Sequence, residues 1–293
     1  MAKQTGAVVV TGASTGIGRA TALYLDQKGY RVFAGVRKSS DANRLKKEGS
    51  KKLTPITIDV TKPRSIATAR QKVQRAVGKK GLAGLVNNAG IAGAGPIEHL
   101  PVEEFEKVID VNLTGQYRVS QEFLPLVRKG EGTIVFITSI GGLIASPFFS
   151  PYNAAKFGLE GLADSLRREL RPWKKMKVVV VEPGSIATPI WDKGTAAVDE
   201  VSAKMRPGYQ KLYGKQMQVM RKVSTETAER GLEPLEVAEV VEKAIRKRRP
   251  KTRYIVGRDA KMMKRTSGLV GDKNFDRLMH RQMGMPNEVP SGR

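Results

Sequence analysis

Cysteine is absent from this 293-residue chain, and histidine occurs twice, at His99 and His280. The absence of cysteine excludes disulfide bonds and thiolate catalysis, and two isolated histidines are too few for a metal site built from imidazoles. The first residues, MAKQTGAVVVTG, lack a hydrophobic region of signal-peptide length, and no run reaches the ~18 apolar residues of a membrane helix. We therefore expect a cytoplasmic protein with no metal site and no transmembrane segment.

Acidic residues are scarce: 28 Asp and Glu stand against 52 Lys and Arg, for a formal net charge of +24. Such a balance would suit nucleic acid or an anionic membrane. Much of the charge is spread along expected helices, as at residues 167–177, and the densest run, RKRRPK at 246–251, would close a helix whose dipole favours cations. Because no nucleic-acid-binding motif is recognisable, we expect no specific nucleic-acid partner, while peripheral membrane contact stays open.

Glycine is abundant, with 30 residues, and three of them fall in one short segment near the start of the chain. The β-branched run at residues 7–10 leads into TGASTGIG at 11–18, which is followed by an amphipathic helix to about Gly29. A buried strand, a glycine turn and a helix form a phosphate-binding site, because Gly12 permits the turn while Gly16 and Gly18 let the pyrophosphate approach the backbone. This segment predicts a dinucleotide-binding site.

The second expected strand, at residues 30–36, ends in Arg37 and Lys38. Sites that prefer NAD place a carboxylate near this position, whereas a basic residue accommodates the additional phosphate of NADP. We therefore predict NADP(H) rather than NAD(H). The alternative is an exposed basic loop in a chain that contains many.

Further strands are expected at residues 53–59, 82–90, 133–139, 177–183 and 253–256, with helices between them. Asp59 at the end of the third strand is a candidate acceptor for an adenine amino group. Asn87 and Asn88 end the fourth, and they suit bracing of neighbouring strands as well as cofactor contact. The alternation predicts an α/β protein with a single-domain Rossmann fold: a doubly wound, seven-stranded parallel sheet with helices on both faces.

The segment YNAAK places Tyr152 and Lys156 four residues apart, on one face of an expected helix. A phenol near neutral pH is a poor acid or base, and a neighbouring ammonium is expected to lower its pKa. The pair alone is a weak signal. Ser139, thirteen positions earlier, and Asn112 strengthen it, because donors would then converge where negative charge develops on a substrate oxygen.

The order and spacing of six features resembles the short-chain dehydrogenase/reductase family, continuously over residues 6–188. These features are TGASTGIG, NNAG, Asn112, Ser139, YNAAK and PGSIAT. The resemblance implies that Tyr152 is the general acid/base and that Lys156 lowers its pKa and holds the nicotinamide ribose. It also implies that Ser139 binds the substrate oxygen and that Asn112 supports a water on the proton path. The implied cofactor site comprises Gly12, Ser14, Thr15, Gly16, Ile17, Gly18, Arg37, Lys38, Asp59, Val60, Asn88, Ala89, Gly90, Tyr152, Lys156, Pro183, Gly184, Ile186 and Thr188.

The segment GLIASPFF at residues 142–149 lies between Ser139 and Tyr152 and would wall the reacting centre with apolar groups. The sequence around this segment resembles that of the family branch that holds retinol, hydroxysteroid and 3-hydroxybutyrate dehydrogenases and their bacterial relatives. We expect an oxidoreductase acting on a bulky lipophilic alcohol, ketone or aldehyde, steroid-like or retinoid-like. The alternatives are an enzyme of small hydroxyacids or 3-oxoacyl substrates, and a non-catalytic dinucleotide sensor.

The regular alternation of strands and helices is interrupted at about residues 189–232, where one or two amphipathic helices are expected to form a lid. This insertion belongs to a catalytic domain of residues 1–257, and residues 258–293 are expected to form a helical extension. Apolar stripes on the helices at 102–127 and 152–173 favour a homodimer or homotetramer.

Overall fold

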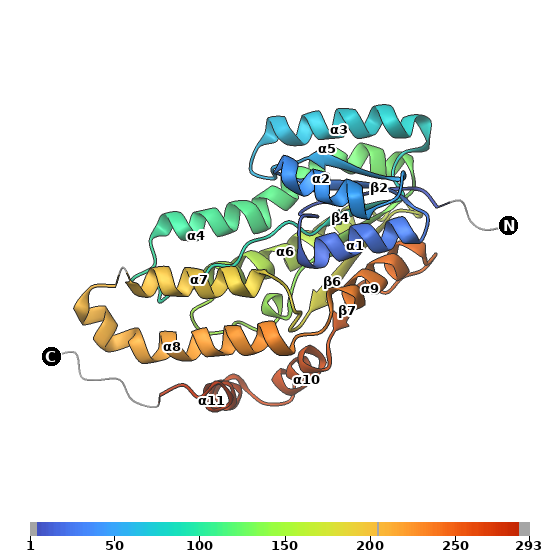
Figure 1. The fold of residues 1–293 in the computed structure, drawn as a ribbon. Coiled ribbons are helices and arrows are strands. Elements are labelled where there is room, and N and C mark those ends of the chain that lie inside the picture. The colour runs from blue at the N-terminus through green and yellow to red at the C-terminus, as the bar shows by residue number, and fades with distance from the viewer. Residues whose placement is uncertain (1–4, 204, 287–293) are drawn as a thin grey trace.

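The computed structural model describes residues 5–203 and 205–286, and its centre is a seven-stranded parallel sheet in the order β3-β2-β1-β4-β5-β6-β7 (Figure 1). The predicted α/β sheet is confirmed. Short runs of β-branched residues buried on both faces form the inner strands, as parallel sheets require. The strands are β1 (Ala7–Val10), β2 (Arg31–Val36), β3 (Leu53–Thr57), β4 (Gly84–Asn87), β5 (Thr133–Ile137), β6 (Lys177–Pro183) and β7 (Arg253–Val256).

Helices cover both faces of the sheet. On one face lie α1 (Gly16–Gln27), α2 (Ser39–Glu48) and α9 (Pro234–Arg246), which bury Leu25, Leu45 and Val241 against the strands. On the other face, α3 (Pro63–Val77), α5 (Gly115–Lys129) and α6 (Ser150–Glu169) bury Val73, Phe123 and Leu159. These two apolar layers hold the strand ends in fixed positions.

The strand order reverses between β1 and β4, which pair with each other through Val8 and Gly84, Val9 and Leu85, and Val10 and Val86. Their connections leave on opposite sides of the sheet, so the carboxyl ends of β1 and β4 form a topological switch point. Ligands of open parallel sheets bind at this position.

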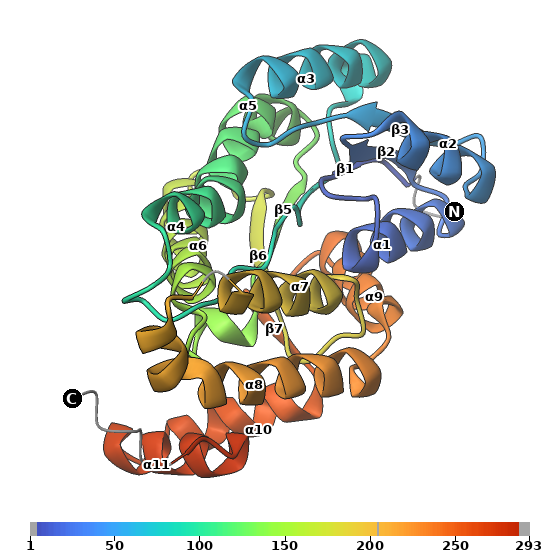
Figure 2. The same cartoon turned by 60° about the vertical axis from the view of Figure 1, so that its left-hand side comes forward.

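The remaining helices lie toward that end of the sheet. A helix α4 (Val102–Ile109) continues through a π-helical turn (Asp110–Thr114) into α5. The expected insertion contains α7 (Ile190–Ala203) and α8 (Pro207–Arg230), which pack side by side, and α10 (Arg258–Ser267) and α11 (Asp272–Met283) follow β7 along α8 (Figure 2). Residue 204 of the expected lid and residues 287–293 of the expected extension lie outside the described residues.

Among the described helices, none is both long enough and apolar enough to cross a bilayer. Four strands are shorter than the sequence predicts: the second begins at Arg31 rather than residue 30, and the fourth spans Gly84–Asn87 rather than residues 82–90. The third ends at Thr57 rather than Asp59, because the Asp59 main-chain N–H donates to Ser65 Oγ at 3.0 Å instead of continuing the ladder. The fifth ends at Ile137, and Ser139 begins a short 3₁₀ turn (Ile140–Gly142).

Candidate active site

Tyr152 and Lys156 lie one turn apart on α6, as their spacing predicts. The Lys156 Nζ atom is 5.5 Å from the centroid of the Tyr152 ring and donates a 2.9 Å hydrogen bond to the carbonyl of Ile137, the last residue of β5. Lys156 is buried, whereas Tyr152 is half-buried. The sheet end therefore fixes the ammonium behind the phenol.

Ser139 is held beside Tyr152 by the turn that follows β5. Its Oγ accepts a 3.0 Å hydrogen bond from the Gly141 N–H. A Cβ added at Gly141 would lie 3.2 Å from Tyr152 Cε1 and 3.4 Å from Ser139 Oγ, so both side chains lie against this glycine. The structure thus brings together the phenol and hydroxyl that are thirteen residues apart in the chain.

Burial raises the pKa of Tyr152, and its hydrogen bond with Ser139 lowers it by less, so the pKa lies above the ordinary value for a phenol. Neither of these causes involves Lys156, so the lowering of the Tyr152 pKa by that ammonium stays a prediction. Lys156 is itself desolvated, which lowers the pKa of its ammonium to about 8, and its Nζ donates to a main-chain carbonyl. Glu160 acts in the opposite direction and raises the pKa of Lys156.

Asn112 lies in the π-helical turn, fully buried, and not in the α-helix expected for it. Its Oδ1 accepts from the Ile91 N–H at 2.8 Å, and its Nδ2 donates to the Ile91 carbonyl at 2.9 Å. The turn packs against α6, where Gly158 meets Leu113. A π-helical turn is frequent at functional sites because it re-aims one side chain. One lone pair and one N–H of the amide remain able to hold a water.

The glycine loop after β1 is tied to the end of β4. Asn88 Nδ2 donates to the Thr11 carbonyl at 2.9 Å and to the Gly12 carbonyl at 3.2 Å, so this asparagine braces the two strands. Thr11, which the sequence prediction missed, accepts from the N–H groups of Asn88 and Ala89 through its hydroxyl. Its place at the head of TGASTGIG was the signal that could have identified it.

The loop fits a dinucleotide phosphate. Gly12 and Gly16 have positive φ angles of 64° and 53°, and a Cβ on Gly18 would lie 2.2 Å from the Gly12 carbonyl oxygen. Thr15 at the N-cap makes no side-chain capping hydrogen bond, and the first turn of α1 holds no acidic residue. The positive end of the helix dipole is therefore free of a protein carboxylate, which suits an anion.

Basic side chains lie at the neighbouring strand ends. Arg37 and Lys38 are exposed after β2, and Arg37 helps to lower the pKa of Asp59, although burial of that carboxyl acts first and in the opposite direction. The Thr61 N–H and hydroxyl both donate to Asp59 and lower its pKa as well. Arg44, which sequence reasoning missed, donates to the Ser14 carbonyl at 2.6 Å. These cations suit a ribose that carries a phosphate.

The other predicted cofactor residues lie around the carboxyl ends of the same strands. Ile17 packs beside the core and Val60 is buried, while the Ala89 carbonyl accepts from Gln116, and Gly90 lies next to Asn112 Oδ1. Pro183 is buried at the end of β6, and Ser185, next to Gly184, donates from its N–H to Asp259 at 2.9 Å.

The Ile186 side chain is buried in the core and its carbonyl accepts from the Trp191 indole at 2.7 Å, so a contact with a ligand would come from its N–H. Thr188 reaches over the glycine loop: a Cβ on Gly16 would lie 3.0 Å from Thr188 Cγ2. The start of the insertion therefore lies against the phosphate-binding loop.

An apolar wall stands on the other side of Tyr152. The Phe149 ring meets the Tyr152 ring edge-on at 6.5 Å, and Phe148 meets Tyr213 of α8 at 6.4 Å. Buried Met205 and Met217 of the insertion pack with these aromatic residues. An open groove of about 800 Å³ lies nearby, lined by residues 95–98, residues 145–148, Ser150, Asn153, Ala154, Phe157 and Tyr213.

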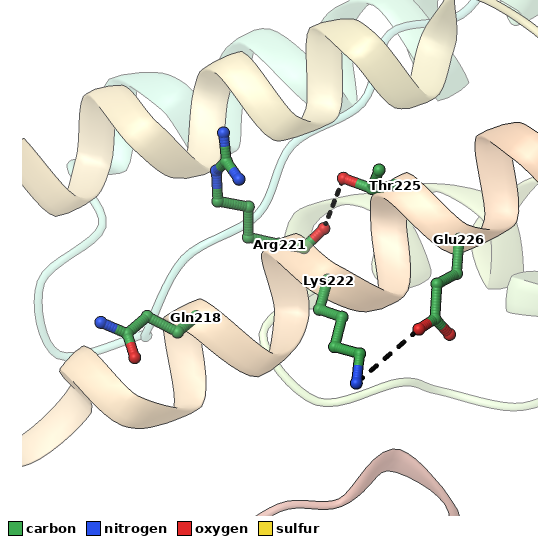
Figure 3. A pocket seen from close by; sticks show the side chains of 5 residues that line it. All are labelled: Gln218, Arg221, Lys222, Thr225 and Glu226. Carbon is green, nitrogen blue, oxygen red and sulfur yellow. Dashed lines mark hydrogen bonds and ion pairs between the residues drawn. The ribbon is translucent and has the colours of Figure 1, made fainter.

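A second hollow lies on the exposed side of α8, lined by Gln218, Arg221, Lys222, Thr225 and Glu226 (Figure 3). Thr225 donates to the Arg221 carbonyl at 3.1 Å, and Lys222 pairs with Glu226 at 3.8 Å. The Arg221 guanidinium pairs instead with Asp199 of α7 at 2.8 Å. The hollow is therefore an ordinary solvated surface and is not part of the site.

Comparisons with known proteins agree with this geometry. The family model described as short chain dehydrogenase matches residues 6–199. The chain is 36% identical to retinol dehydrogenase 5 of Mus musculus, over 87% of this chain and 82% of that protein. It is 33% identical to the NADPH-dependent 3-dehydrocapnine reductase of Ornithobacterium rhinotracheale, over 94% and 96%.

Among solved structures, a short-chain dehydrogenase/reductase from Burkholderia phymatum in complex with NAD superposes with a TM-score of 0.77 and 21% identity, covering 99% of each chain. At that identity the likeness shows the fold alone. The family match and the two relatives show more: this chain is an oxidoreductase that belongs to the short-chain dehydrogenase/reductase family.

Proposed function

We propose that the protein is an NADP(H)-dependent enzyme that interconverts a bulky lipophilic alcohol and the corresponding ketone or aldehyde. The observation that carries the proposal is the grouping of the Tyr152 phenol, the Ser139 hydroxyl and the Lys156 ammonium beside an apolar wall. A polar cluster of this kind, bordered by aromatic rings, suits a substrate with one reacting oxygen and a large apolar body.

The nicotinamide, when bound, supplies or accepts the hydride. Ser139 donates to the substrate oxygen and orients it toward Tyr152. In reduction, Tyr152 gives its proton to that oxygen as negative charge develops there; in oxidation it removes the hydroxyl proton. Lys156 stabilises the phenolate, and its ammonium is expected to hold the ribose hydroxyls as well. Asn112 holds a water on the path by which the proton is replaced.

The preference for NADP(H) is supported by Arg37, Lys38 and Arg44 near the end of β2 and the glycine loop. A guanidinium binds a ribose phosphate through two parallel hydrogen bonds, which is stronger than a contact with a hydroxyl. Of the related proteins, the reductase from Ornithobacterium rhinotracheale is named as NADPH-dependent, whereas the Burkholderia phymatum structure holds NAD.

The lipophilic substrate is supported by Phe148, Phe149 and the insertion, and by the relative that is named a retinol dehydrogenase. We also propose that α7 and α8 form a lid. The insertion begins over the phosphate loop and contacts the apolar wall through Tyr213, so one segment would cover both the cofactor and the substrate.

A panel of alcohols and ketones run with NADP(H) and NAD(H), followed by nicotinamide absorbance, tests the proposal. Bulky apolar substrates should react, and NADP(H) should be preferred. Turnover of short hydroxyacids or 3-oxoacyl compounds alone would move the enzyme to the alternative substrate class. Cofactor binding without turnover of any compound would instead favour a dinucleotide sensor.

The matched variant is Tyr152→Phe, which removes one oxygen and keeps the ring. It should lower kcat by about 10²–10⁴-fold, the usual contribution of general acid/base catalysis, and leave the Kd for the cofactor nearly unchanged. Turnover that survives this change would contradict the assignment of the acid/base.

We further propose that the protein self-associates through the outer faces of α4, α5 and α6. Large apolar side chains are exposed on them: Val102, Phe105, Tyr117 and Phe157. Apolar groups gathered on neighbouring helices favour an interface between copies. Sedimentation velocity should give a dimer or tetramer, and Phe157→Glu should shift the population toward monomer; a wild-type monomer at micromolar concentration would contradict this.

A further inference from the structure

Behind the catalytic helix, one guanidinium is shared by three carboxylates. Arg253 of β7 donates through Nε and Nη2 to Glu160 Oε2 at 3.1 and 3.0 Å. The same Nη2 lies 3.0 Å from Asp164 Oδ1, and Nε lies 3.3 Å from Glu182 Oε1. Glu160 and Asp164 come from α6, Glu182 from β6, so the cluster joins the catalytic helix to the last two strands.

The two glutamates of the cluster are buried, whereas Asp164 is half-buried and pairs with Arg167 and Arg168 as well. Glu182 and Glu160 are 1% and 7% exposed. Burial, followed by the charge of Glu160, raises the pKa of Glu182 to about 7, while Arg253 and Lys264 of α10 lower it by less. Burial lowers the pKa of Lys156, and the charge of Glu160 on the same helix acts in the opposite direction.

Glu160 is placed to act on Lys156. The two residues are four apart on α6 and therefore occupy the same face one turn apart. The loop that carries Ser139 rests on this turn: a Cβ on Gly142 would lie 3.0 Å from the Lys156 carbonyl oxygen and 3.3 Å from Glu160 Cγ. Arg253 fixes the far side of the carboxylate, so its charge cannot swing away.

We propose that Glu160 is a positioning residue for the reaction: its carboxylate, clamped by Arg253, keeps Lys156 in the charged form that stabilises the Tyr152 phenolate. The role in the reaction depends on the proposed function, whereas the effect on Lys156 does not. Lys156 is otherwise buried with a neutral carbonyl as its partner, which disfavours an ammonium. Strand β7 thereby supports the active site from 93 residues away.

The test measures the titration of Lys156 directly, in protein without cofactor, by NMR of lysine labelled with ¹³C at Cε. The Lys156 signal is the one that disappears in Lys156→Arg. In the wild type its midpoint should lie near 8. In Glu160→Gln the midpoint should fall by roughly one pH unit, the usual effect of removing a neighbouring opposite charge.

Asp164→Asn is the matched control, because it neutralises another α6 carboxylate that contacts the same guanidinium. Its midpoint should remain near 8, and an equal fall in both variants would overturn the proposal, as would an unchanged midpoint in Glu160→Gln. Should Glu160→Gln fail to fold, Glu160→Asp retains the charge but withdraws it by one methylene, and a smaller fall is expected; no fall there would overturn the proposal too.

The consequence for the reaction is read from the pH profile. In Glu160→Gln, the pH at which kcat/KM falls on the alkaline side should move down together with the Lys156 midpoint. Activity at pH 6 should stay within about twofold of wild type, because Lys156 is charged at that pH in both the wild type and the variant. A uniform loss of activity at every pH would indicate a structural defect. If the wild type turns over no alcohol or ketone, the proposed function fails while the NMR result still decides the role of Glu160.

Discussion

The Tyr213 hydroxyl donates a 2.7 Å hydrogen bond to Glu98 Oε2, which joins α8 of the insertion to the loop between β4 and α4. Both residues line the apolar groove beside Phe148. Because solvent screens this exposed pair, the bond is worth at most about 1 kcal/mol. It is therefore expected to hold α8 near the groove only weakly.

Tyr213→Phe removes this bond and keeps the ring contact with Phe148. We expect KM for a bulky apolar substrate to rise by roughly threefold, because α8 is less firmly held over the groove. For a small alcohol, kcat should change little. Hydrogen exchange in α8 should become faster. Tyr209→Phe is the control, since Tyr209 meets His99 through its ring at 5.3 Å; equal effects of both variants would contradict the assignment.

We expect the free energy of unfolding to depend on pH through Glu182. Its pKa is about 7 in the folded protein and about 4.5 as an ordinary side chain, so the folded state binds the proton more tightly. A raised carboxyl pKa means that stability contributed by the protonated group is lost as the pH rises from about 4.5 to 7. Glu182→Gln, which mimics the protonated form, should remove that loss.

Denaturant titrations should therefore show Glu182→Gln more stable than wild type at pH 8 by about 1–3 kcal/mol, with the difference vanishing near pH 4.5. Asp164→Asn should behave oppositely. Hydrogen bonds and charges from Arg167 and Arg253 outweigh burial and lower the pKa of Asp164, so the stability that it contributes is present above its unfolded pKa and lost as the pH falls. Parallel curves for wild type and Glu182→Gln between pH 4.5 and 8 would refute the prediction.

The order of strands and helices could be predicted because each is encoded locally: buried β-branched runs mark β1 and β6, and TGASTGIG marks the turn into α1. The positions of Ser139, Tyr152 and Lys156 follow from the same local motifs. The π-helical turn at Asp110–Thr114 could not be predicted, because apolar spacing through Val111 and Leu113 fits an α-helix equally well.

Long-range electrostatics were also beyond the sequence. Arg253 and Glu160 are 93 residues apart, and neither belongs to a recognisable motif. The spacing of Tyr152 and Lys156 places an ammonium near the phenol but does not reveal that burial raises the pKa of Tyr152. Burial depends on the packing of distant segments, which no local pattern reports.

We expect Arg37 to determine the preference for NADPH over NADH. Arg37→Asp should weaken NADPH binding at least tenfold, about 1.4 kcal/mol, because a carboxylate replaces the cation that would meet the ribose phosphate. NADH binding should be unchanged or tighter. Fluorescence titration of both cofactors measures the ratio. Lys28→Asp, an equal change of charge at the opposite end of α1, should leave the ratio as it is; a wild-type ratio in Arg37→Asp would rule out the assignment.

Gly18 tests the phosphate-binding loop, and Gly161, far from the loop, serves as its control. A Cβ at Gly18 would lie 2.2 Å from the Gly12 carbonyl oxygen and 2.4 Å from Asn88 Nδ2, so Gly18→Ala must push α1 away from the loop. A Cβ at Gly161, in the middle of α6, meets nothing within 4 Å among the described residues. Gly161→Ala should therefore stabilise the protein by about 0.5–1 kcal/mol through helix propensity.

Gly18→Ala should lose at least tenfold in affinity for either cofactor and should unfold at lower temperature, because the displaced helix no longer presents its first N–H groups to the phosphate. Thermal unfolding with and without NADPH separates the two effects. The rise in Tm that NADPH causes should persist in Gly161→Ala and shrink in Gly18→Ala. A full NADPH-induced rise in Gly18→Ala would mean that the pyrophosphate does not lie on the amino end of α1.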